Sequence, residues 1–517
     1  MNIAYKGSFL REGLEDNGHQ VFDLDLDECE NLDAALKALP RPADLVVWEF
    51  YGGFSAIRKF SRCDAPVAAY CVDTPLNEFW LCACMKNLDY VFVDQPQCVE
   101  SLAKNGVPAS WLPLPAKKTW FQPKREKKHD ITFIGTLSGL RQKRANLLNL
   151  VQSKFRVNIM SGIAIPEAQK IFAESKIILN ENFFPGLTMR VLQGLSAGAI
   201  VFTEQSPYGH DFGLKDFVDL VYYNADNILE RLSEVLDNHD KYVAIANQGQ
   251  KKCGALYSCA HVAGELLSRI EAEGLRKRDV GQEDWIWNQA SSELLYAQRY
   301  GGNFSGAMRL LTTVAESSLD RAAEAHVLIS DIQARFKDIQ LAEAHYKAIY
   351  DALPASMASL KLALLHIQAN EPEAALEYIV SWIRNCQGKF RGNISDILNS
   401  GKEMRQNLLA AIAEIYFSLG RRWDMGFQKK FRDPVPETAF DVARMAWDEK
   451  PSQWALEMMK RCLKPCHMEG ELLPYMMEGI KAGILPQRQL AEAAAIAYGY
   501  YDRDSAAKIV ADMKKAG

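Results

Sequence analysis

The 517-residue sequence lacks the features that would assign it at once to several protein classes. No apolar stretch approaches the roughly 18 residues that a membrane-spanning helix needs. The first residues carry no basic start, long apolar run or small-residue cleavage site, so we expect no signal peptide. There is also no Gly-x-Ser-x-Gly, P-loop or Gly-x-Gly-x-x-Gly pattern, which argues against hydrolases, kinases and dehydrogenases.

The cysteines and the net charge argue against further classes. The 11 cysteines are odd in number and form no regular framework, which favours reduced thiols and a cytoplasmic location. Cys82-x-Cys84 and Cys462-x-x-x-Cys466-His467 have no matching pair at zinc-site spacing, so we expect buried thiols and no metal site. A net charge of -5 argues against general nucleic-acid binding.

The composition is that of a globular chain, and the length predicts roughly three domains. Charge is unevenly distributed: residues 1–50 hold 4 Lys or Arg and 11 Asp or Glu, whereas residues 117–144 hold 9 and 2. The basic stretch overlaps a proline-flanked segment, residues 112–130, that is typical of a linker. Two interpretations stay open, a solvated linker and a positive rim beside an anion site.

The N-terminal part alternates apolar strands with helical patterns. Strands are expected over residues 43–50, 65–73 and 90–95, and helices over 31–40, 54–62 and 96–106. Nearly continuous apolar strands separated by helices predict a doubly wound parallel sheet. We therefore expect a first Rossmann-like domain over residues 1–117.

The same alternation restarts at residue 130. Strands are expected over residues 130–135, 155–161, 176–180 and 198–204, and helices over 144–153, 166–175, 188–197, 226–237 and 261–273. This pattern predicts a second Rossmann-like domain over residues 118–275. Ligands bind at the carboxyl ends of the strands in such sheets, so we expect a cleft between the two domains.

From residue 284 the strand patterns disappear, and residues 284–517 read as helices joined by short turns. A small residue is followed four positions later by a bulky one at Ala307 and Leu311, Ala342 and Tyr346, and Ala375 and Ile379. The alanines are separated by 35 and then 33 residues. This spacing resembles tetratricopeptide repeats, and it predicts a helical array with an extended surface for a protein partner.

The strongest chemical signal lies in residues 177–204. A strand ends at Asn180, a loop with Gly186 follows, and a helix begins near Thr188. A helix N-terminus suits a phosphate, and Arg190 in the first turn adds a cationic fork for a diphosphate. The alternative is an ordinary helix with an exposed arginine.

Two further residues of this stretch are candidates for donor binding. Gln193 lies three residues after Arg190, hence on the same face, where its amide can bond to sugar hydroxyls. Glu204 ends the next strand.

A second element is the strand end at residues 130–135. Gly135 directly after the strand allows close backbone approach to a ligand, and Thr136 can hydrogen-bond to it. Arg141 or Arg144 can then meet a phosphate. Both elements would lie at the carboxyl edge of one sheet.

Together these residues resemble bacterial GT-B glycosyltransferases, particularly the spore-maturation-type, CgeB-like branch, over about residues 1–270. The carriers are DITFIGT followed by Arg144-Ala-Asn-Leu-Leu, and KIILN followed by TMRVLQGLSAGAIVFTE. The family pattern Arg-x-Phe-Glu-x-x-x-x-Gly is matched at Arg190 and Gly198, but Leu192 and Gln193 depart from it. In related retaining transferases the acid holds the nucleotide ribose, and Gln193 can still accept a hydrogen bond.

The N-terminal half carries a weaker resemblance. The segment CVDTPLNEFW resembles the family's strand followed by Asp-x-Pro. Asp73 is accordingly expected to contact an acceptor hydroxyl or a sugar. The equally weighted alternative is that Asp73 only caps the turn before Pro75.

The resemblance implies a glycosyltransferase that moves a sugar from a nucleotide-diphosphate donor to a protein or glycan. It implies a retaining, metal-independent reaction without a cofactor, in which Arg190 and Arg144 stabilise the leaving diphosphate. One alternative is a degenerate transferase that acts as a protein-binding scaffold, which Gln193 favours. Another is a sugar-nucleotide epimerase, since that chemistry shares the two-domain fold.

Overall fold

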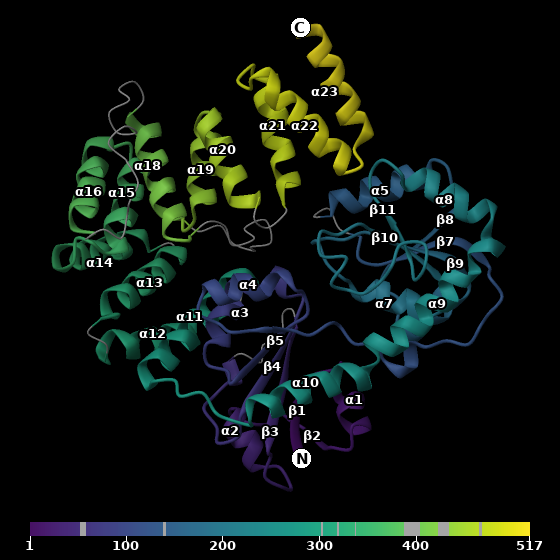
Figure 1. Ribbon diagram of the computed structural model, residues 1–517. Coiled ribbons are helices and arrows are strands. Elements are labelled where there is room, and N and C mark those ends of the chain that lie inside the picture. The colour runs from purple at the N-terminus through teal and green to yellow at the C-terminus, as the bar shows by residue number, and fades with distance from the viewer. Residues whose placement is uncertain are drawn as a thin grey trace. The chain divides into compact units, whose positions relative to one another are not determined.

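The computed structural model describes residues 1–51, 58–137, 141–300, 303–317, 320–336, 338–386, 404–421, 434–464 and 468–516 (Figure 1). The chain divides into two units. The first comprises Met1–Asp279 together with Ala494–Lys508, and the second comprises Val280–Ala493 together with Ile509–Gly517. The domain ranges 1–117, 118–275 and 284–517 stay predictions.

The first unit contains two separate sheets, of which the N-terminal one has six parallel strands in the order β2-β1-β3-β4-β5-β6. The strands are β1 (Asn2–Lys6), β2 (Gln20–Asp23), β3 (Leu45–Tyr51), β4 (Val67–Val72), β5 (Tyr90–Val93) and β6 (Ser110–Trp111). Strand β4 is buried along its whole length and β3 along all but its last residue, as their apolar sequences predict.

Helices lie between these strands along the chain. They are α1 (Arg11–Asp16), α2 (Leu32–Lys37), α3 (Thr74–Met85) and α4 (Gln97–Lys104). The predicted strands are confirmed, as are the helices predicted over residues 31–40 and 96–106. Residues 54–57 of the helix predicted over 54–62 lie outside the described part of the chain. Strands β1, β2 and β6 and helices α1 and α3 are additional. Strands β1 and β2 begin and end with polar residues, and Asp73-Thr74-Pro75 reads as a turn.

The second sheet has five parallel strands in the order β11-β10-β9-β7-β8. The strands are β7 (His129–Ile134), β8 (Val157–Met160), β9 (Ser175–Asn180), β10 (Ile200–Glu204) and β11 (Val221–Tyr223). The helices are α5 (Gln142–Gln152), α6 (Ile165–Ala173), α7 (Met189–Ser196), α8 (Ile228–Asp237), α9 (His239–Tyr257) and α10 (Cys259–Glu273). Two separate parallel sheets with alternating helices confirm the predicted fold class for this half of the chain.

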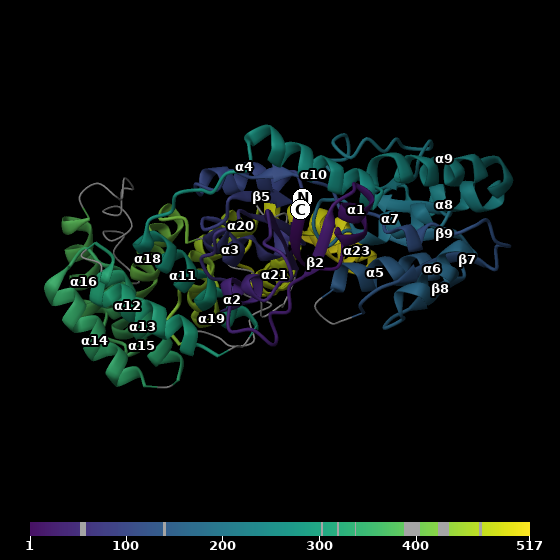
Figure 2. The same ribbon diagram turned by 90° about the horizontal axis from the view of Figure 1, so that it is seen from below.

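Helix α10 returns to the first sheet and packs beside α1 (Figures 1 and 2). The Cys259 thiol accepts a hydrogen bond from the Gly13 amide at 3.1 Å. A Cβ atom on Gly13 would lie 2.1 Å from the Cys259 carbonyl oxygen, so this approach requires glycine. The two sheets are therefore held in one unit by the last helix of the second α/β segment.

The basic segment between the sheets does not form one positive rim. Lys118 forms an ion pair with Asp16 at 2.6 Å, and Lys127 donates to the carbonyls of Ala173 and Gly198, each at 3.0 Å. Those carbonyls precede β9 and β10, so Lys127 lies at the amino edge of the second sheet. The basic residues from 141 onward lie at its opposite, carboxyl edge.

The second unit is helical throughout its described residues. Its helices, with the two that it shares with the first unit, are α11 (Gln282–Tyr300), α12 (Ser305–Ser317), α13 (Ala322–Arg335), α14 (Ile339–Ala352), α15 (Met357–Gln368), α16 (Pro372–Asn385), α18 (Met404–Ser418), α19 (Ala439–Glu449), α20 (Gln453–Leu463), α21 (Leu473–Lys481), α22 (Gln487–Gly499) and α23 (Arg503–Ala516). From α11 to α16 each helix packs on the next. The small and bulky residues of the predicted repeat are all buried, on α12, α14 and α16. The spacing thus marks every second helix of this series.

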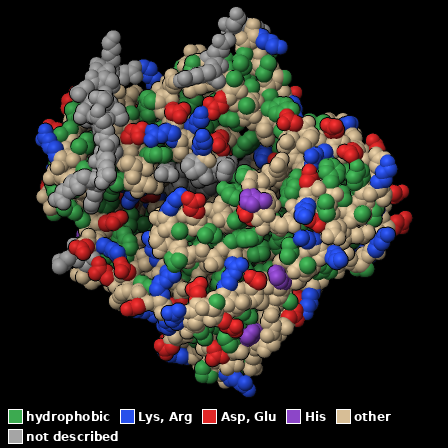
Figure 3. Space-filling view, in the orientation of Figure 1, with side chains coloured by type: hydrophobic (Ala, Val, Ile, Leu, Met, Phe, Trp, Pro, Cys, Tyr) green, Lys and Arg blue, Asp and Glu red, His purple; other side chains and the backbone are tan. Residues whose placement is uncertain are grey.

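On the face of the described residues shown in Figure 3, acidic and basic side chains are interspersed and form no large patch of one charge. Within the described ranges, no helix is both long enough and apolar enough to cross a bilayer. No disulfide joins the cysteines of the described ranges, and Cys466 and His467 lie outside those ranges.

Candidate active site

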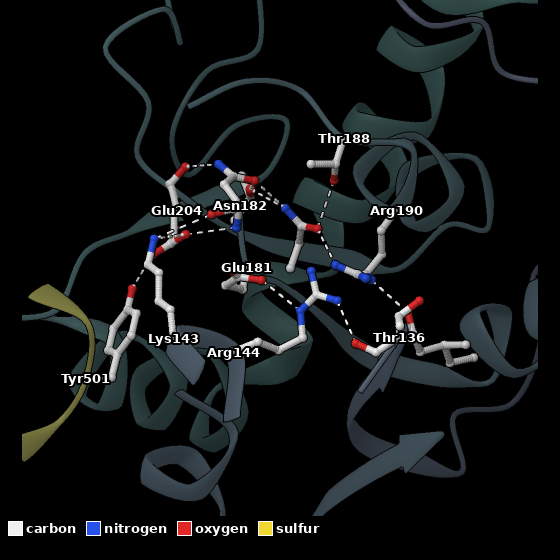
Figure 4. A network of polar contacts seen from close by, with 12 residues as sticks. Thr136, Lys143, Arg144, Glu181, Asn182, Thr188, Arg190, Glu204 and Tyr501 are labelled. Atoms are coloured by element: carbon white, nitrogen blue, oxygen red, sulfur yellow. Dashed lines mark hydrogen bonds and ion pairs between the residues drawn. The ribbon is translucent and has the colours of Figure 1, made fainter. Parts of the chain in front are cut away.

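The carboxyl edge of the second sheet brings several predicted residues together (Figure 4). Strands β7, β9 and β10 are neighbours in the sheet. Gly135 and Thr136 therefore follow one strand end, Asn180 closes the next, and Glu204 closes the third. Because parallel strands end at the same edge, residues far apart in the sequence become one polar cluster.

Arg190 lies in the first turn of α7 and points to this edge. Its Nε donates to the Ile134 carbonyl at 2.8 Å, and its Nη1 donates to Asn180 Oδ1 at 2.7 Å. The guanidinium also lies over the Phe133 ring, 4.4 Å from the ring centroid. Neutral acceptors and an aromatic face thus orient the cation.

Gly135 is needed for this placement of Arg190. A Cβ atom built on Gly135 would lie 2.3 Å from Arg190 Nη2. The sequence predicts that a ligand approaches the backbone closely at Gly135. In the structure, the group that approaches Gly135 is the Arg190 guanidinium.

Arg144 is the second arginine of the cluster and is nearly fully buried. Its Nε donates to Glu181 at 2.8 Å, and its Nη1 donates to the Thr136 carbonyl at 2.8 Å. Its charge is therefore balanced by a carboxylate, unlike that of Arg190.

The cluster holds more positive charge than its carboxylates neutralise. Burial, with nearby Arg144 and Arg141, lowers the pKa of Arg190 to about 9, against the effect of Glu181. Burial and Arg144 also lower the pKa of Arg141, whose guanidinium lies 4.3 Å from the Phe183 ring centroid. Such unneutralised cations in a partly buried site are stabilised by an anion.

Asn180 connects Arg190 with the start of α7. The Asn180 Oδ1 atom accepts from Thr188 Oγ1 at 2.9 Å as well as from Arg190. The Thr188 side chain does not cap α7. It is instead part of the arrangement that fixes Asn180.

The loop before α7 is fixed by the N-terminal sheet. Gln95, which follows β5, donates to the Leu187 carbonyl at 2.8 Å and accepts from the Leu187 amide at 3.1 Å. A Cβ atom on Gly186 would lie 2.2 Å from Gln95 Oε1, so Gly186 allows this contact. Carboxyl-end loops of the two sheets therefore touch.

Asp73 lies at the carboxyl end of β4 in a left-handed conformation, with φ at 53°. Its side chain does not cap α3. The buried Asp94 carboxylate takes that role, accepting from the amides of Asp73 at 2.9 Å and Thr74 at 3.0 Å. The alternative in which Asp73 only caps the turn is therefore wrong.

Among the described residues, none donates a hydrogen bond to the Asp73 carboxylate. Burial and neighbouring Asp94 raise its pKa to about 7, and Arg141 acts in the opposite direction. Arg141, which follows β7 of the second sheet, thus acts electrostatically on a carboxylate that follows β4 of the first.

Gln193 is not part of this polar cluster. Its side chain is half-buried, and no described residue hydrogen-bonds to its amide group. Its expected contact with a ribose stays a prediction.

Several polar residues of the site are additional to the predictions: Lys143, Glu181, Asn182, Asp94 and Tyr501. Glu181 and Asn182 directly follow Asn180, so their position after a strand is a signal that the sequence does contain. Asp94 follows β5 in the same way. Tyr501 lies 297 residues from its partner Glu204, and no local pattern marks it.

The described residues contain no group of three or more His, Cys, Asp or Glu side chains arranged to hold a metal ion. Of the cysteines considered above, Cys84 and Cys462 are buried and Cys82 is half-buried.

Comparison with known proteins agrees with this geometry. Residues 118–268 match a protein family described as glycosyl transferase-like. This segment contains the whole second sheet and the arginine cluster, and the match confirms the predicted enzyme class for it. A search of curated proteins found no match for the chain.

Solved structures provide more distant likenesses. HepE of Anabaena, in complex with UDP and glucose, has a TM-score of 0.37 at 9% identity over 52% of this chain and 99% of HepE. Sucrose-phosphate synthase from Thermosynechococcus elongatus has a TM-score of 0.39 at 12% identity over 53% of this chain and 100% of the synthase. The pneumococcal O-GlcNAc transferase GtfA has a TM-score of 0.31 at 12% identity over 44% of this chain and 56% of GtfA. Likenesses this distant establish no shared activity.

Proposed function

We propose that this protein is a glycosyltransferase of the GT-B type that moves a sugar from a nucleotide-diphosphate donor to a protein or glycan acceptor. The observation that carries the proposal is the arginine cluster at the carboxyl edge of the second sheet. Arg190 is held there by neutral acceptors and keeps a positive charge that no hydrogen-bonded carboxylate balances. A diphosphate supplies the missing negative charge.

The cluster fits the electrostatic demand of the reaction. When the bond between sugar and diphosphate breaks, negative charge grows on the leaving diphosphate. Fixed cations in a partly buried site stabilise that charge more strongly in the transition state than in the donor. Arg190 and Arg141 take this role, and Arg144 supports them through its bonds to Glu181 and Thr136. We propose that these cations make a metal unnecessary and that the anomeric configuration is retained.

Asp73 supplies a polar group from the first sheet. A carboxylate with a pKa of about 7 changes its protonation near neutral pH. We propose that it accepts a hydrogen bond from a hydroxyl of the acceptor or of the transferred sugar.

The helical region is proposed to bind the acceptor or another protein partner as a tetratricopeptide-like array. Helix α14 and its flanks expose the apolar residues Phe336, Ile339, Leu341 and Leu353. Exposed apolar side chains of this kind are the residues that a protein partner would cover. The alternative is that the helices only stabilise the transferase.

The decisive test is a thermal-shift panel of UDP, GDP, ADP and CDP, with and without EDTA. A ligand at about 100 times its Kd stabilises the native state by about 2.7 kcal/mol, which raises the melting temperature. We expect one nucleotide to raise it, EDTA to leave the shift intact, and Arg190→Ala to remove it. A panel without any shift would leave the scaffold alternative, which the glutamine at position 193, in place of the acid of the family pattern, favours.

Gln193→Glu distinguishes the two interpretations further. If Gln193 faces the ribose, the carboxylate accepts from ribose hydroxyls at least as well, so we expect equal or tighter nucleotide binding. Titration calorimetry with the nucleotide from the panel measures this. Loss of binding in Gln193→Glu would show that Gln193 donates a needed hydrogen bond or lies elsewhere.

A further inference from the structure

A tyrosine from the far C-terminal end of the chain belongs to the polar cluster of the second sheet. Tyr501 lies in the turn between α22 and α23, within the segment that packs in the first unit. Its hydroxyl donates to Glu204 Oε1 at 2.6 Å, and its side chain is buried (Figure 4). Burial and Glu204 raise the pKa of Tyr501 far above its usual range. The hydroxyl therefore stays protonated and acts as the hydrogen-bond donor to Glu204.

The turn is anchored at several points on the second sheet. Arg503 donates to the Ala225 carbonyl just after β11, and Asn146 of α5 donates to the Tyr500 carbonyl at 3.1 Å. Tyr501 adopts a left-handed conformation with φ at 59°, which is disfavoured for so bulky a side chain. The Asp502 amide donates to the Ala497 carbonyl at 2.9 Å, so this conformation closes the C-terminal end of α22.

Glu204 also contacts residues that lie between Tyr501 and the arginine cluster. Its Oε1 also forms an ion pair with the Lys143 ammonium at 2.8 Å, and its Oε2 accepts from the backbone N–H of Asn182 at 2.8 Å. The carboxylate therefore fixes both a cation on α5 and the loop that follows β9.

Asn182 completes the path. Its Oδ1 accepts from Asn180 Nδ2 at 2.7 Å, and Asn180 Oδ1 in turn accepts from Arg190 and Thr188. A series of contacts thus runs from Tyr501 through Glu204 to the backbone of Asn182, and from the Asn182 side chain through Asn180 to the first turn of α7.

We infer that Tyr501 is a positioning residue for the donor site and that it acts through Glu204 and the two asparagines on Arg190. This inference rests on the proposed function, because it takes Arg190 as a ligand of the donor diphosphate. It gives the turn between α22 and α23 a direct influence on donor affinity. A partner that lifts this turn from the sheet would weaken donor binding.

The test compares three variants of the full chain. Tyr501→Phe keeps the buried ring and removes only the hydroxyl. Tyr498→Phe removes the hydroxyl of an exposed tyrosine close to the same turn and serves as the matched control. Arg503→Ala loosens the anchoring of the turn and leaves the Tyr501 hydroxyl in place, so it measures the effect of lost packing alone.

Two quantities are measured for each variant, the Kd of the nucleotide that the panel identifies and the hydrogen exchange of backbone amides over residues 180–192. For Tyr501→Phe we expect nucleotide binding to weaken by about five- to twentyfold, within the usual range of coupling between sites, and exchange over 180–192 to accelerate. Tyr498→Phe should match the wild type in both. Arg503→Ala should accelerate exchange mainly over 494–508 and change Kd less than Tyr501→Phe.

The outcomes separate the inference from the proposed function. Unchanged Kd and unchanged exchange over 180–192 in Tyr501→Phe would overturn the inference. So would an Arg503→Ala protein that loses as much affinity as Tyr501→Phe at equal loss of melting temperature, because the role would then be packing. A wild-type protein that binds none of the nucleotides would overturn the proposed function, and the donor-site role of Tyr501 with it.

Discussion

At the scale of single residues, the proposed donor site contains charges whose burial costs stability. Arg190 is partly buried and has only neutral hydrogen-bond acceptors, and Asp73 is half-buried with no described hydrogen-bond donor. Burial of this kind favours the neutral form, so it lowers the pKa of an arginine and raises the pKa of a carboxyl group. Perturbed groups that gather at one edge of a sheet are typical of functional sites.

Arg190→Ala should nearly abolish turnover and leave the fold intact. Loss of one fixed donor to a developing charge costs about 3–4 kcal/mol, or 10²–10³ in rate. The melting temperature should change little, because the variant also removes a cation that burial destabilises. Turnover with a donor sugar and thermal unfolding measure the two effects.

The exposed Arg156, just before β8, provides the control for this variant. Arg156→Ala should keep wild-type turnover. Equal turnover in Arg190→Ala and Arg156→Ala would remove Arg190 from the site.

The raised pKa of Asp73 predicts that its contribution to the stability of the folded protein depends on pH. Its pKa in the folded protein, about 7, lies above the value of about 3.9 in an unfolded chain. The folded state therefore binds the proton more tightly, and Asp73 destabilises the fold progressively as pH rises from about 4 to about 7. Above that range the penalty is constant.

Asp73→Asn removes this penalty and keeps the left-handed conformation that asparagine tolerates. We expect the variant to be more stable than the wild type by about 1–2 kcal/mol at pH 8, after discounting for partial exposure, and equally stable near pH 4. Transfer to the acceptor should fall. Unfolding curves across pH measure the first effect, and a stability difference that does not vary with pH would contradict the assignment.

At the scale of elements, the second sheet was the most predictable part of the chain. Strands β7, β8, β9 and β10 and helix α7 carry apolar patterns that the sequence shows, and Gly198 marks a helix end. Strands β1 and β2 begin and end with polar residues and lack such a signal. Contacts such as that of Tyr501 with Glu204 depend on how the chain closes on itself, which no local pattern encodes.

The residues of the site follow the same division. Arg190, Arg144, Asn180 and Glu204 lie at element ends that the sequence marks, and the structure brings them together. The capping role considered for Asp73 belongs to Asp94, because only the fold shows which carboxylate faces the start of α3.

The junction between β7 and α7 gives a prediction at this scale. In Gly135→Ala the new methyl group would lie 2.3 Å from Arg190 Nη2, so the guanidinium must move. We expect nucleotide binding to weaken at least tenfold, about 1.4 kcal/mol. Gly18→Ala is the control, since a Cβ there meets nothing within 4 Å and only the left-handed backbone is strained. Equal nucleotide binding in both variants would show that Arg190 can move without cost.

At the scale of the whole molecule, the chain combines the proposed donor site with a helical region, of which residues Ala494–Lys508 belong to the first unit. Residues Ala494–Lys508 pack in that unit, and Tyr501 is among them. Removing everything after residue 280 would therefore damage the donor site as well as the helical region. Point variants on the helical surface separate acceptor recruitment from donor binding more cleanly.

The variant for this purpose is Ile339→Ser with Leu341→Ser, which replaces two exposed apolar side chains at the start of α14. Little buried surface is lost, so nucleotide affinity and donor hydrolysis should stay at wild-type values. If the helices recruit a protein acceptor, transfer of labelled sugar to cell proteins should fall at least fivefold, as expected when interface residues worth about 1 kcal/mol each are lost. Val218→Ser, an exposed apolar residue of the first unit, should leave all three quantities unchanged. Normal transfer to proteins by the double variant would place recruitment elsewhere, whereas lost nucleotide binding would show that this surface supports the donor site.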